Sequence, residues 1–325
     1  MINITIVMPA YNVAHYIPRA IESVLQQDYD HWELIIINDG STDNTLDVIE
    51  SFAQKDSRIK WVNQENQGVS AARNRGLSLA QGRYITFLDA DDFYEKHYLA
   101  SMSEPLERQD ADMTFCKYRE TDGEIILKES PSEINHLWQD SFIEHLAYVK
   151  DAIHPMACMY RLDLIKRHEI VFNRNYSYGE DQEFLLHYAY CATKIVFVPL
   201  VLYNYFYRQG SLSHQQIAYT DLIGELDSLY WLEDLVGDQP RETKEAYAAY
   251  IERRRQGVLN NIRRYYWSLL RSKQFDLLLA SLDQYETKYH QSFNPTYSGI
   301  QKLTLGIKVK IISSRSRRLW HFFAK

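Results

Sequence analysis

Three carboxylates crowd the end of an apolar run in this 325-residue chain. Residues 84–88 are apolar apart from one threonine, and Asp89, Asp91 and Asp92 follow directly. Clustered carboxylates repel one another unless a cation lies among them. Magnesium and similar hard cations are commonly held by one or two carboxylates together with substrate phosphates. The stretch therefore indicates a site for a metal-bound phosphate compound, and a solvated acidic loop that caps the next helix is the alternative.

The segments around these acids predict a doubly wound α/β sheet. Apolar runs typical of buried strands alternate with stretches of helical periodicity, which favours a mostly parallel sheet. The first strands are expected at residues 2–8, 32–37, 59–62 and 82–88. Pro9 is expected to end the first strand, and a helix is expected from about Val13.

Polar segments follow three of these strands. They are Pro9 to Asn12, Asp39 with its neighbours, and Asp89 to Asp92. Ligands bind at the carboxyl ends of strands in open α/β sheets, so the three segments favour one shared site. The chain has neither Gly-x-Gly-x-x-Gly after its first strand nor Gly-x-x-x-x-Gly-Lys-Ser/Thr, which argues against dinucleotide-type and P-loop phosphate binding.

Four motifs occur in an order typical of one family. They are VMPAYN at 7–12, NDGSTD at 38–43, NQGVSAARNRG at 66–76 and FLDADD at 87–92. Through them, residues 1 to about 215 resemble the inverting glycosyltransferases of family 2, which have the GT-A fold. The resemblance implies transfer of a hexose or N-acetylhexosamine from a UDP-sugar, with Mn²⁺ or Mg²⁺ as cofactor.

The resemblance also implies a nucleotide-sugar pocket. Its members would be Pro9, Tyr11, Asn12, Asp39, Arg73, Asp89, Ala90 and Asp91. Pro9 and Tyr11 would pack on the base and ribose, and Asp39 would accept a hydrogen bond from a uracil-like ring. Asp89 would face the ribose, and Asp91 would bind the metal ion that bridges the two phosphates.

Each of these residues also has a structural alternative. Pro9 could simply end a strand, and Tyr11 could be packing. Asp39 with Gly40 is a common turn pair. Arg73, which the resemblance places beside the nucleotide, could lie on a solvated helix face.

An acidic pair follows later, in the sequence YGED at residues 178–181. Acids in a first helical turn are stabilised by the helix dipole, which is the structural alternative. Inversion requires a base that takes the proton of the acceptor hydroxyl. By resemblance Asp181 is that base, and Glu180 is the second candidate.

Two further candidates follow the strand expected at residues 195–205. Family members often place a basic or metal-binding segment over the diphosphate here. Arg208 could pair with phosphate through two hydrogen bonds, and His214 could be a further metal ligand. An exposed loop position is the alternative for His214, because a lone histidine carries little specificity.

Periodicity divides the chain into parts. The expected parts are a catalytic domain at 1–215 (nucleotide-binding half about 1–92, acceptor half about 93–215), a helical region at 216–298 and a basic, aromatic tail at 299–325. The acceptor half is expected to contain a hairpin around Asp122 and Gly123 and a strand at residues 154–160. Nothing in the acceptor half identifies the acceptor, which could be a glycan, a lipid-linked acceptor or a protein-linked acceptor.

Cysteine content, hydropathy and charge indicate the setting. Three widely spaced cysteines, no signal peptide and no membrane-spanning run predict a cytosolic location. Eight basic and no acidic residues follow Glu286, whereas the preceding chain has 28 basic and 43 acidic residues, a net charge of −15. An anionic membrane surface is one partner for this tail, and a tail packed on the acidic body or in a homo-oligomer is the alternative. No nucleic-acid partner is expected.

Two classes of function remain. The first is a metal-dependent glycosyltransferase for capsule, exopolysaccharide, cell-wall or glycoprotein glycan synthesis. The second is a nucleotide-sugar- or carbohydrate-binding protein that keeps the fold without catalysis. The presence of Asp89, Asp91 and Asp181 together favours the first. A nucleotidyltransferase is disfavoured because its glycine-rich N-terminal loop is absent.

Overall fold

The computed structural model describes residues 3–130, 142, 153–175, 179–207, 219–237 and 241–289. The chain divides into two compact units, residues 1–216 with 236–250 and residues 217–235 with 251–325. The predicted basic tail lies outside the described residues, as do Arg208 and His214. The predicted domain boundaries stay predictions, because both units include residues outside the described ranges.

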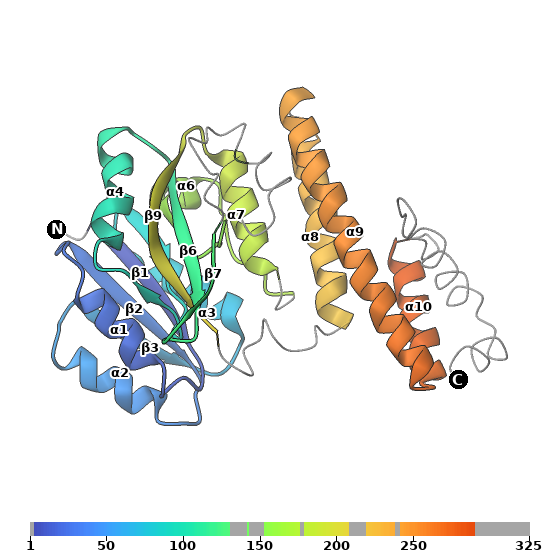
Figure 1. The fold of residues 1–325 in the computed structure, drawn as a ribbon, viewed down its shortest axis with the longest axis horizontal. Helices are drawn as coiled ribbons and strands as arrows, with labels where there is room; N and C mark the ends of the chain where they lie inside the picture. The colour runs from blue at the N-terminus through green and yellow to red at the C-terminus, as the bar shows by residue number, and fades with distance from the viewer. Residues whose placement is uncertain are drawn as a thin grey trace. The chain divides into compact units, whose positions relative to one another are not determined.

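One sheet with helices packed against it forms the first unit, as Figure 1 shows. The strands are β1 (Ile4–Ala10), β2 (Trp32–Asp39), β3 (Ile59–Gln64), β4 (Tyr84–Phe87), β5 (Phe93–Tyr94), β6 (Met113–Thr121), β7 (Ile126–Glu129), β8 (Cys158–Arg161) and β9 (Ile195–Phe206). The helices are α1 (Ile17–Leu25), α2 (Thr45–Ala53), α3 (Val69–Leu79), α4 (Tyr98–Arg108), α6 (Leu162–Arg167) and α7 (Glu180–Cys191). The alternation of strands and helices through β4 confirms the predicted α/β class.

The sheet has two halves of different character. Its strand order is β3-β2-β1-β4-β8-β6-β9-β5, with β7 paired to β6. The strands from β3 to β4 are parallel, as predicted, and we call them the parallel half. In the mixed half, β6 and β9 are parallel, whereas β8 lies antiparallel between β4 and β6. The parallel half brings the ends of β1, β2 and β4 to one edge, where ligands of such sheets bind.

Two of the boundaries that differ from the prediction in the parallel half involve prolines. β1 continues through Pro9 instead of ending before it. Pairing with β4 ends at Val7, so at Pro9 the strand needs ladder hydrogen bonds only toward β2. α1 begins at Ile17 and not near Val13, because Pro18 suits a first helical turn and the carbonyl of Val13 closes a turn before it.

The strand predicted at residues 154–160 is also shifted. Ala157 donates its N–H to the His154 carbonyl oxygen at 2.9 Å, which makes a turn of residues 154–157. β8 begins only at Cys158. Pro155 explains the shift, because it has no N–H to give to a strand ladder.

The parallel half has an apolar interior. Ile6 on β1 and Ile36 on β2 are fully inaccessible, and burial of each such side chain stabilises the fold by about 1.5–3 kcal/mol. α3 lies so close to β1 that a Cβ at Gly76 would come within 2.3 Å of Val7 Cγ1. This close packing fixes α3, which carries Arg73, against the sheet.

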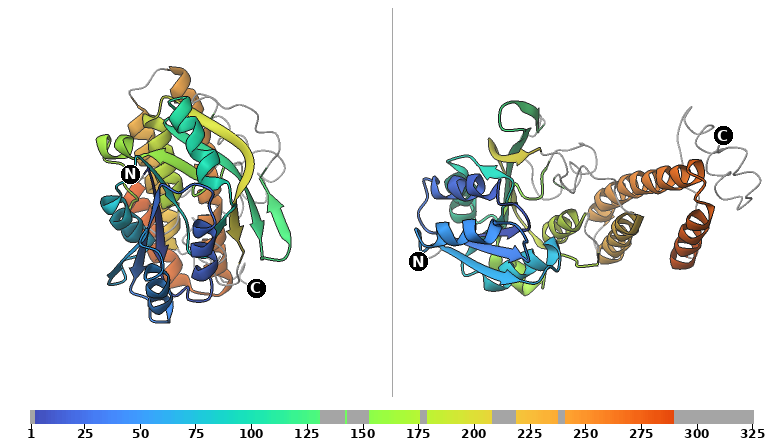
Figure 2. Two further views of the ribbon diagram at one scale, coloured as in Figure 1. Left: turned by 90° about the vertical axis from the view of Figure 1, so that its left-hand side faces the viewer. Right: turned by 90° about the horizontal axis from the view of Figure 1, so that it is seen from below.

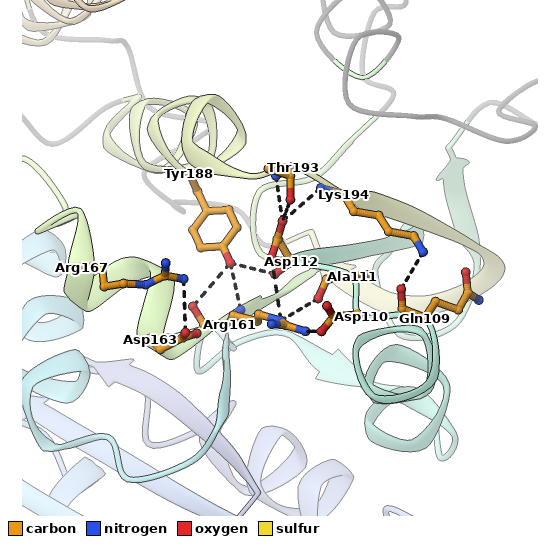
Figure 3. A network of polar contacts seen from close by, with 10 residues as sticks. All are labelled: Gln109, Asp110, Ala111, Asp112, Arg161, Asp163, Arg167, Tyr188, Thr193 and Lys194. Carbon is orange, nitrogen blue, oxygen red and sulfur yellow. Dashed lines mark hydrogen bonds and ion pairs between the residues drawn. The ribbon is translucent and has the colours of Figure 1, made fainter.

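A polar network holds the C-terminal end of α7 against β6 and β8, as Figure 3 shows. The Asp112 carboxylate accepts hydrogen bonds from Thr193 N and Oγ1, both at 2.7 Å, and from Lys194 N at 3.0 Å. The Tyr188 hydroxyl donates to the Asp112 carbonyl oxygen at 2.7 Å and accepts from Arg161 N at 3.0 Å. Burial raises the pKa of Tyr188, so this hydroxyl keeps its proton. The network anchors one end of α7, and the other end carries the acidic pair.

β7 lies at the margin of the sheet, and the hairpin predicted around Asp122 and Gly123 is confirmed. Among the described strands, β7 pairs with β6 alone. All four of its residues are exposed, including Ile126 and Leu127. Figure 2 shows this hairpin at the outside of the unit in both views.

The described part of the second unit is helical. It contains α8 (Tyr219–Val236), α9 (Arg241–Arg271) from Ile251 onward, and α10 (Phe275–Tyr289). The buried hydroxyls of Tyr219 and Tyr266 lie 2.8 Å apart, and both lie within hydrogen-bond distance of the Ser281 carbonyl oxygen. No helix in the described ranges combines the length and the apolar character needed to cross a membrane.

Candidate active site

Asp39 lies at the end of β2 and holds the loop that precedes α3. Its carboxylate accepts hydrogen bonds from Gln64 Nε2 at 2.8 Å, Gln67 N at 2.9 Å and Gly68 N at 2.8 Å. A carboxylate has about four acceptor positions, so room for a ligand donor remains. Asp39 therefore acts on the loop before α3, and its geometry is compatible with the predicted contact to a base.

Tyr11 and Asn12 follow β1 beside the loop after β2. Tyr11 is 48% exposed, which leaves its aromatic ring accessible to a planar ligand. Asn12 has a φ of 52°, and its Oδ1 accepts the N–H of Thr42 at 2.8 Å. The N–H of Asn12 donates to Ser41 Oγ at 3.0 Å. Asn12 therefore ties the two loops together, while Pro9 lies half-buried within β1.

The three acids after β4 occupy different environments. Asp92 is fully buried and accepts hydrogen bonds from the Tyr203 hydroxyl and from Phe206 N, the latter at 2.8 Å. Burial, with the nearby charges of Asp91 and Asp89, raises the pKa of Asp92 well above its ordinary value. Asp92 thus joins this turn to β9, whereas Asp91 and Asp89 remain partly exposed.

Asp91, the predicted metal ligand, lies partly exposed in the turn after β4. Arg19 Nη2 donates to the Asp91 carbonyl oxygen at 2.7 Å, which fixes the backbone of the turn, and Ala90 is buried before it. Within the described ranges, no group of three or more His, Cys, Asp or Glu side chains is placed to hold a metal ion. Mg²⁺ usually takes one or two carboxylates and completes its shell with water and substrate phosphates. Asp91 together with a diphosphate fits that donor set.

Arg73 on α3 joins the end of β4 to the start of α7. Its Nη2 donates to Asp89 Oδ1 and its Nη1 donates to Glu180 Oε1, each at 2.8 Å. The Arg73 side chain is 5% exposed, and its guanidinium carbon lies 5.2 Å from the centre of the Phe172 ring. Burial opposes the charge of Arg73, but Asp89, Glu180 and Asp181 outweigh it and raise the pKa. Arg73 therefore stays charged as a bridge between two carboxylates.

The acidic pair forms the first turn of α7. Gly179 precedes it with a φ of 89°, a left-handed conformation that glycine adopts without strain. Glu180 is 6% exposed, and burial, followed by repulsion from Asp181, raises the pKa of its carboxyl to about 7. Asp181 is partly exposed, and its Oδ1 accepts Gln182 N–H at 2.7 Å. Asp181 is therefore the member of the pair that a substrate reaches more easily.

His154 is a neighbour of these acids that the sequence did not single out as a site residue. Burial lowers its pKa, and the charge of Asp181 opposes that shift. Its ring centre lies 5.2, 5.1 and 5.3 Å from the rings of Tyr118, Tyr203 and Tyr205. These tyrosines come from β6 and β9, so no short sequence motif could have revealed the cluster.

Comparison with known proteins shows the family to which this chain belongs. A family model described as "Glycosyl transferase family 2" matches residues 5–168, half of the chain. The chain belongs to glycosyl transferase family 2. Glycosyltransferase GlyG of Streptococcus pneumoniae is 31% identical over 250 residues, which cover 72% of this chain and 77% of that protein. Putative teichuronic acid biosynthesis glycosyltransferase TuaG of Bacillus subtilis is 40% identical over 116 residues, which cover 35% of this chain and 46% of that protein.

A solved structure shows the same fold. The crystal structure of S. aureus TarS 1-349 in complex with UDP-GlcNAc matches with a TM-score of 0.70 and 18% sequence identity. The match covers 99% of this chain and 91% of the TarS chain. The predicted family, the predicted GT-A fold and the predicted enzyme class are confirmed, so this chain is a glycosyltransferase.

The predicted site residues of this glycosyltransferase fall into two groups. Tyr11 and Asn12 follow β1 beside the loop after β2, and Asp39 ends β2. Asp89 and Glu180 come together through Arg73. Sequence motifs predicted the members of both groups, but they did not predict that Arg73 would link the end of β4 to α7.

Proposed function

We propose that this glycosyltransferase moves a hexose or N-acetylhexosamine from a UDP-sugar to an acceptor hydroxyl, with inversion at the anomeric carbon. The acceptor is a glycan, a lipid-linked acceptor or a protein-linked acceptor in bacterial polysaccharide or glycoconjugate synthesis. The Arg73 bridge carries the proposal, because it brings Glu180, and with it the adjacent Asp181, to Asp89. The UDP-GlcNAc bound in the TarS crystal structure supports the donor, and the similarity to a putative teichuronic acid biosynthesis glycosyltransferase supports a polysaccharide product.

The proposed reaction is a single displacement. The acceptor oxygen forms a bond to the anomeric carbon while the bond from that carbon to the UDP oxygen breaks. Asp181 takes the hydroxyl proton, and UDP leaves with the bonding electrons. When bound at Asp91, Mn²⁺ or Mg²⁺ would neutralise charge on the departing diphosphate. Asp39 and Tyr11 hold the nucleoside at the ends of β2 and β1.

Asp181 is assigned as the base in preference to Glu180 on geometric grounds. A base must come within hydrogen-bond reach of the proton that it takes, and its pKa matters only after that. The pKa of Glu180, about 7, would suit a base, but Glu180 is buried and its Oε1 is already bonded to Arg73. Asp181 is the partly exposed carboxylate.

A screen of UDP-sugars tests the proposal. UDP release should depend on an added acceptor and on Mn²⁺ or Mg²⁺, and EDTA should abolish it. Nuclear magnetic resonance of the product should show the anomer opposite to that of the donor. Retention of the donor's configuration would overturn the single displacement, and full release in EDTA would overturn the metal role of Asp91.

A further inference from the structure

The Arg73 guanidinium binds two carboxylates at once. One nitrogen binds Asp89 at the end of β4 and the other binds Glu180 at the start of α7, each at 2.8 Å. The side chains of Arg73 and Glu180 are only 5% and 8% exposed. A planar guanidinium can hold two carboxylates in fixed directions, whereas a lysine ammonium acts as a point charge. Such depth and geometry suit orientation of neighbouring groups better than contact with a substrate.

We propose that Arg73 and Glu180 are positioning residues, which set the place of the Asp181 carboxylate relative to the donor and exchange no proton with the acceptor. The inference rests on the proposed function of Asp181. Asp181 follows Glu180 directly in the first turn of α7. Any displacement of Glu180 therefore moves the base as well.

Polar contacts hold both ends of α7, and between them the buried Phe184 ring stacks on Phe172 with ring centres 4.1 Å apart. The Asp112 network holds its C-terminal end, and the pairing of Glu180 with Arg73 holds its first turn. Gly179, with a φ of 89°, lets the chain enter the helix at a sharp angle and gives this turn no stiffness of its own. Loss of the Arg73 contact therefore loosens the first turn of α7, which carries the base, while Phe184 and the Asp112 network keep the rest of the helix in place.

Asp89 makes the bridge a link to the donor. By the proposed function Asp89 faces the ribose, and the structure has its Oδ1 bonded to Arg73. A donor seated against Asp89 therefore contacts the same network that holds the first turn of α7. A misplacement of about 1 Å at a reacting group can cost about a hundredfold in rate, so the bridge affects turnover more than donor affinity.

Glu180→Gln tests the positioning role, because it keeps the shape of the side chain and removes its charge. Turnover should fall by about tenfold or more, while donor KM and UDP affinity stay within about twofold. Arg73→Lys should lower turnover in the same way, because lysine cannot bridge both carboxylates. Arg75→Lys is the matched control, since Arg75 is exposed on the same helix, and its turnover should stay within about twofold of the wild type.

A double-mutant cycle separates positioning from general damage. Residues that act as one unit are not additive, so adding Glu180→Gln to Asp181→Asn should lower the residual single-turnover rate by less than about twofold. Arg73→Lys with Asp181→Asn gives a second cycle in case Glu180→Gln does not fold. Melting temperature and UDP calorimetry accompany each variant.

Three results would overturn the inference. The first is wild-type turnover of Glu180→Gln together with a low rate for Asp181→Asn, which leaves the proposed base intact and removes only the positioning role. The second is a full multiplicative loss in both cycles, which means that Glu180 acts independently of Asp181. The third is near wild-type turnover of Asp181→Asn, which refutes the base itself and, with it, the role of its positioning residues.

Discussion

The parallel half and the mixed half of the first unit hold their carboxylates in different ways. Asp39, in the parallel half, is held by donors from the loop next to it, at residues 64–68. Glu180, in the mixed half, depends on Arg73, which lies 107 residues earlier. The proposed donor pocket is therefore built locally, and the proposed catalytic geometry is built by contacts between distant segments. Substitutions in the two halves should change different kinetic quantities.

The largest effect should come from the mixed half. Asp181→Asn keeps the shape of the base and removes its function, so turnover should fall by about a hundredfold or more. UDP affinity, measured by calorimetry, should remain within about threefold. Asp163→Asn, an exposed acid on α6, is the control and should keep normal turnover. If Asp181→Asn also lost UDP binding, the assignment of donor binding to the parallel half and of turnover to the mixed half would be contradicted.

The next effect concerns the turn after β4. Asp91→Asn removes a ligand charge, so UDP binding in the presence of Mn²⁺ should weaken by about tenfold or more. In EDTA the variant and the wild-type protein should bind UDP equally. An equal loss with and without metal would contradict the ligand role and assign Asp91 to the fold of the turn.

A smaller effect is expected from Asp39→Asn. One of the backbone donors at Gln67 and Gly68 would lose its charged acceptor, which loosens the loop before α3. UDP affinity should fall by about tenfold, while turnover at saturating donor stays within about twofold. Calorimetry checks the expected loss of UDP affinity, and steady-state kinetics checks the expected turnover. A loss confined to turnover would reverse the assignment of the parallel half to donor binding.

The smallest effect is a pH dependence of stability in the mixed half. Burial of His187 on α7, together with the charge of His168, lowers the pKa of His187 from 6.5 to about 4. The unfolded chain binds this proton more readily, so the stabilising contribution is complete above pH 6.5 and is lost as the pH falls toward 4. After allowance for partial exposure, the loss in unfolding free energy should be about 1–2 kcal/mol.

Denaturant unfolding at pH 7 and pH 4.5 checks the His187 prediction. His187→Gln should reduce the difference between the two pH values, and His31→Gln, at an exposed position, should leave it unchanged. An unchanged difference in His187→Gln would assign the acid sensitivity to other groups.

Much of the parallel half could be predicted from the sequence. Its strands are continuous apolar runs, and the motifs follow them immediately, so β2 was located within two residues. The mixed half offers weaker signals. β8 has four residues, and its position depends on pairing with β4 and β6. The hydrophobic periodicity of so short a segment does not predict this pairing. The strand predicted at residues 154–160 was displaced for that reason and because of Pro155.

The site shows the same division. Asp39, Asp89 and Asp181 could be named from motifs, because each lies beside a strand end or a helix start. The burial of Asp92 under Tyr203 and the bridge from Arg73 could not be named, since they arise from pairs 111 and 107 residues apart. Contacts of this kind depend on the packed fold and leave no pattern in a short window of sequence.

The exposed strand β7 has a consequence for how the protein behaves in concentrated solution. An edge strand with accessible apolar residues is a template on which another extended chain can assemble into aggregates. Ile126 and Leu127 point to opposite faces of β7, so neither face of the strand is polar. Lys128 and Glu129 supply the charges that oppose stacking of such edges. Lys128→Val would lengthen the apolar run that begins at Ile125 to four residues, and the protein should then precipitate at lower concentrations.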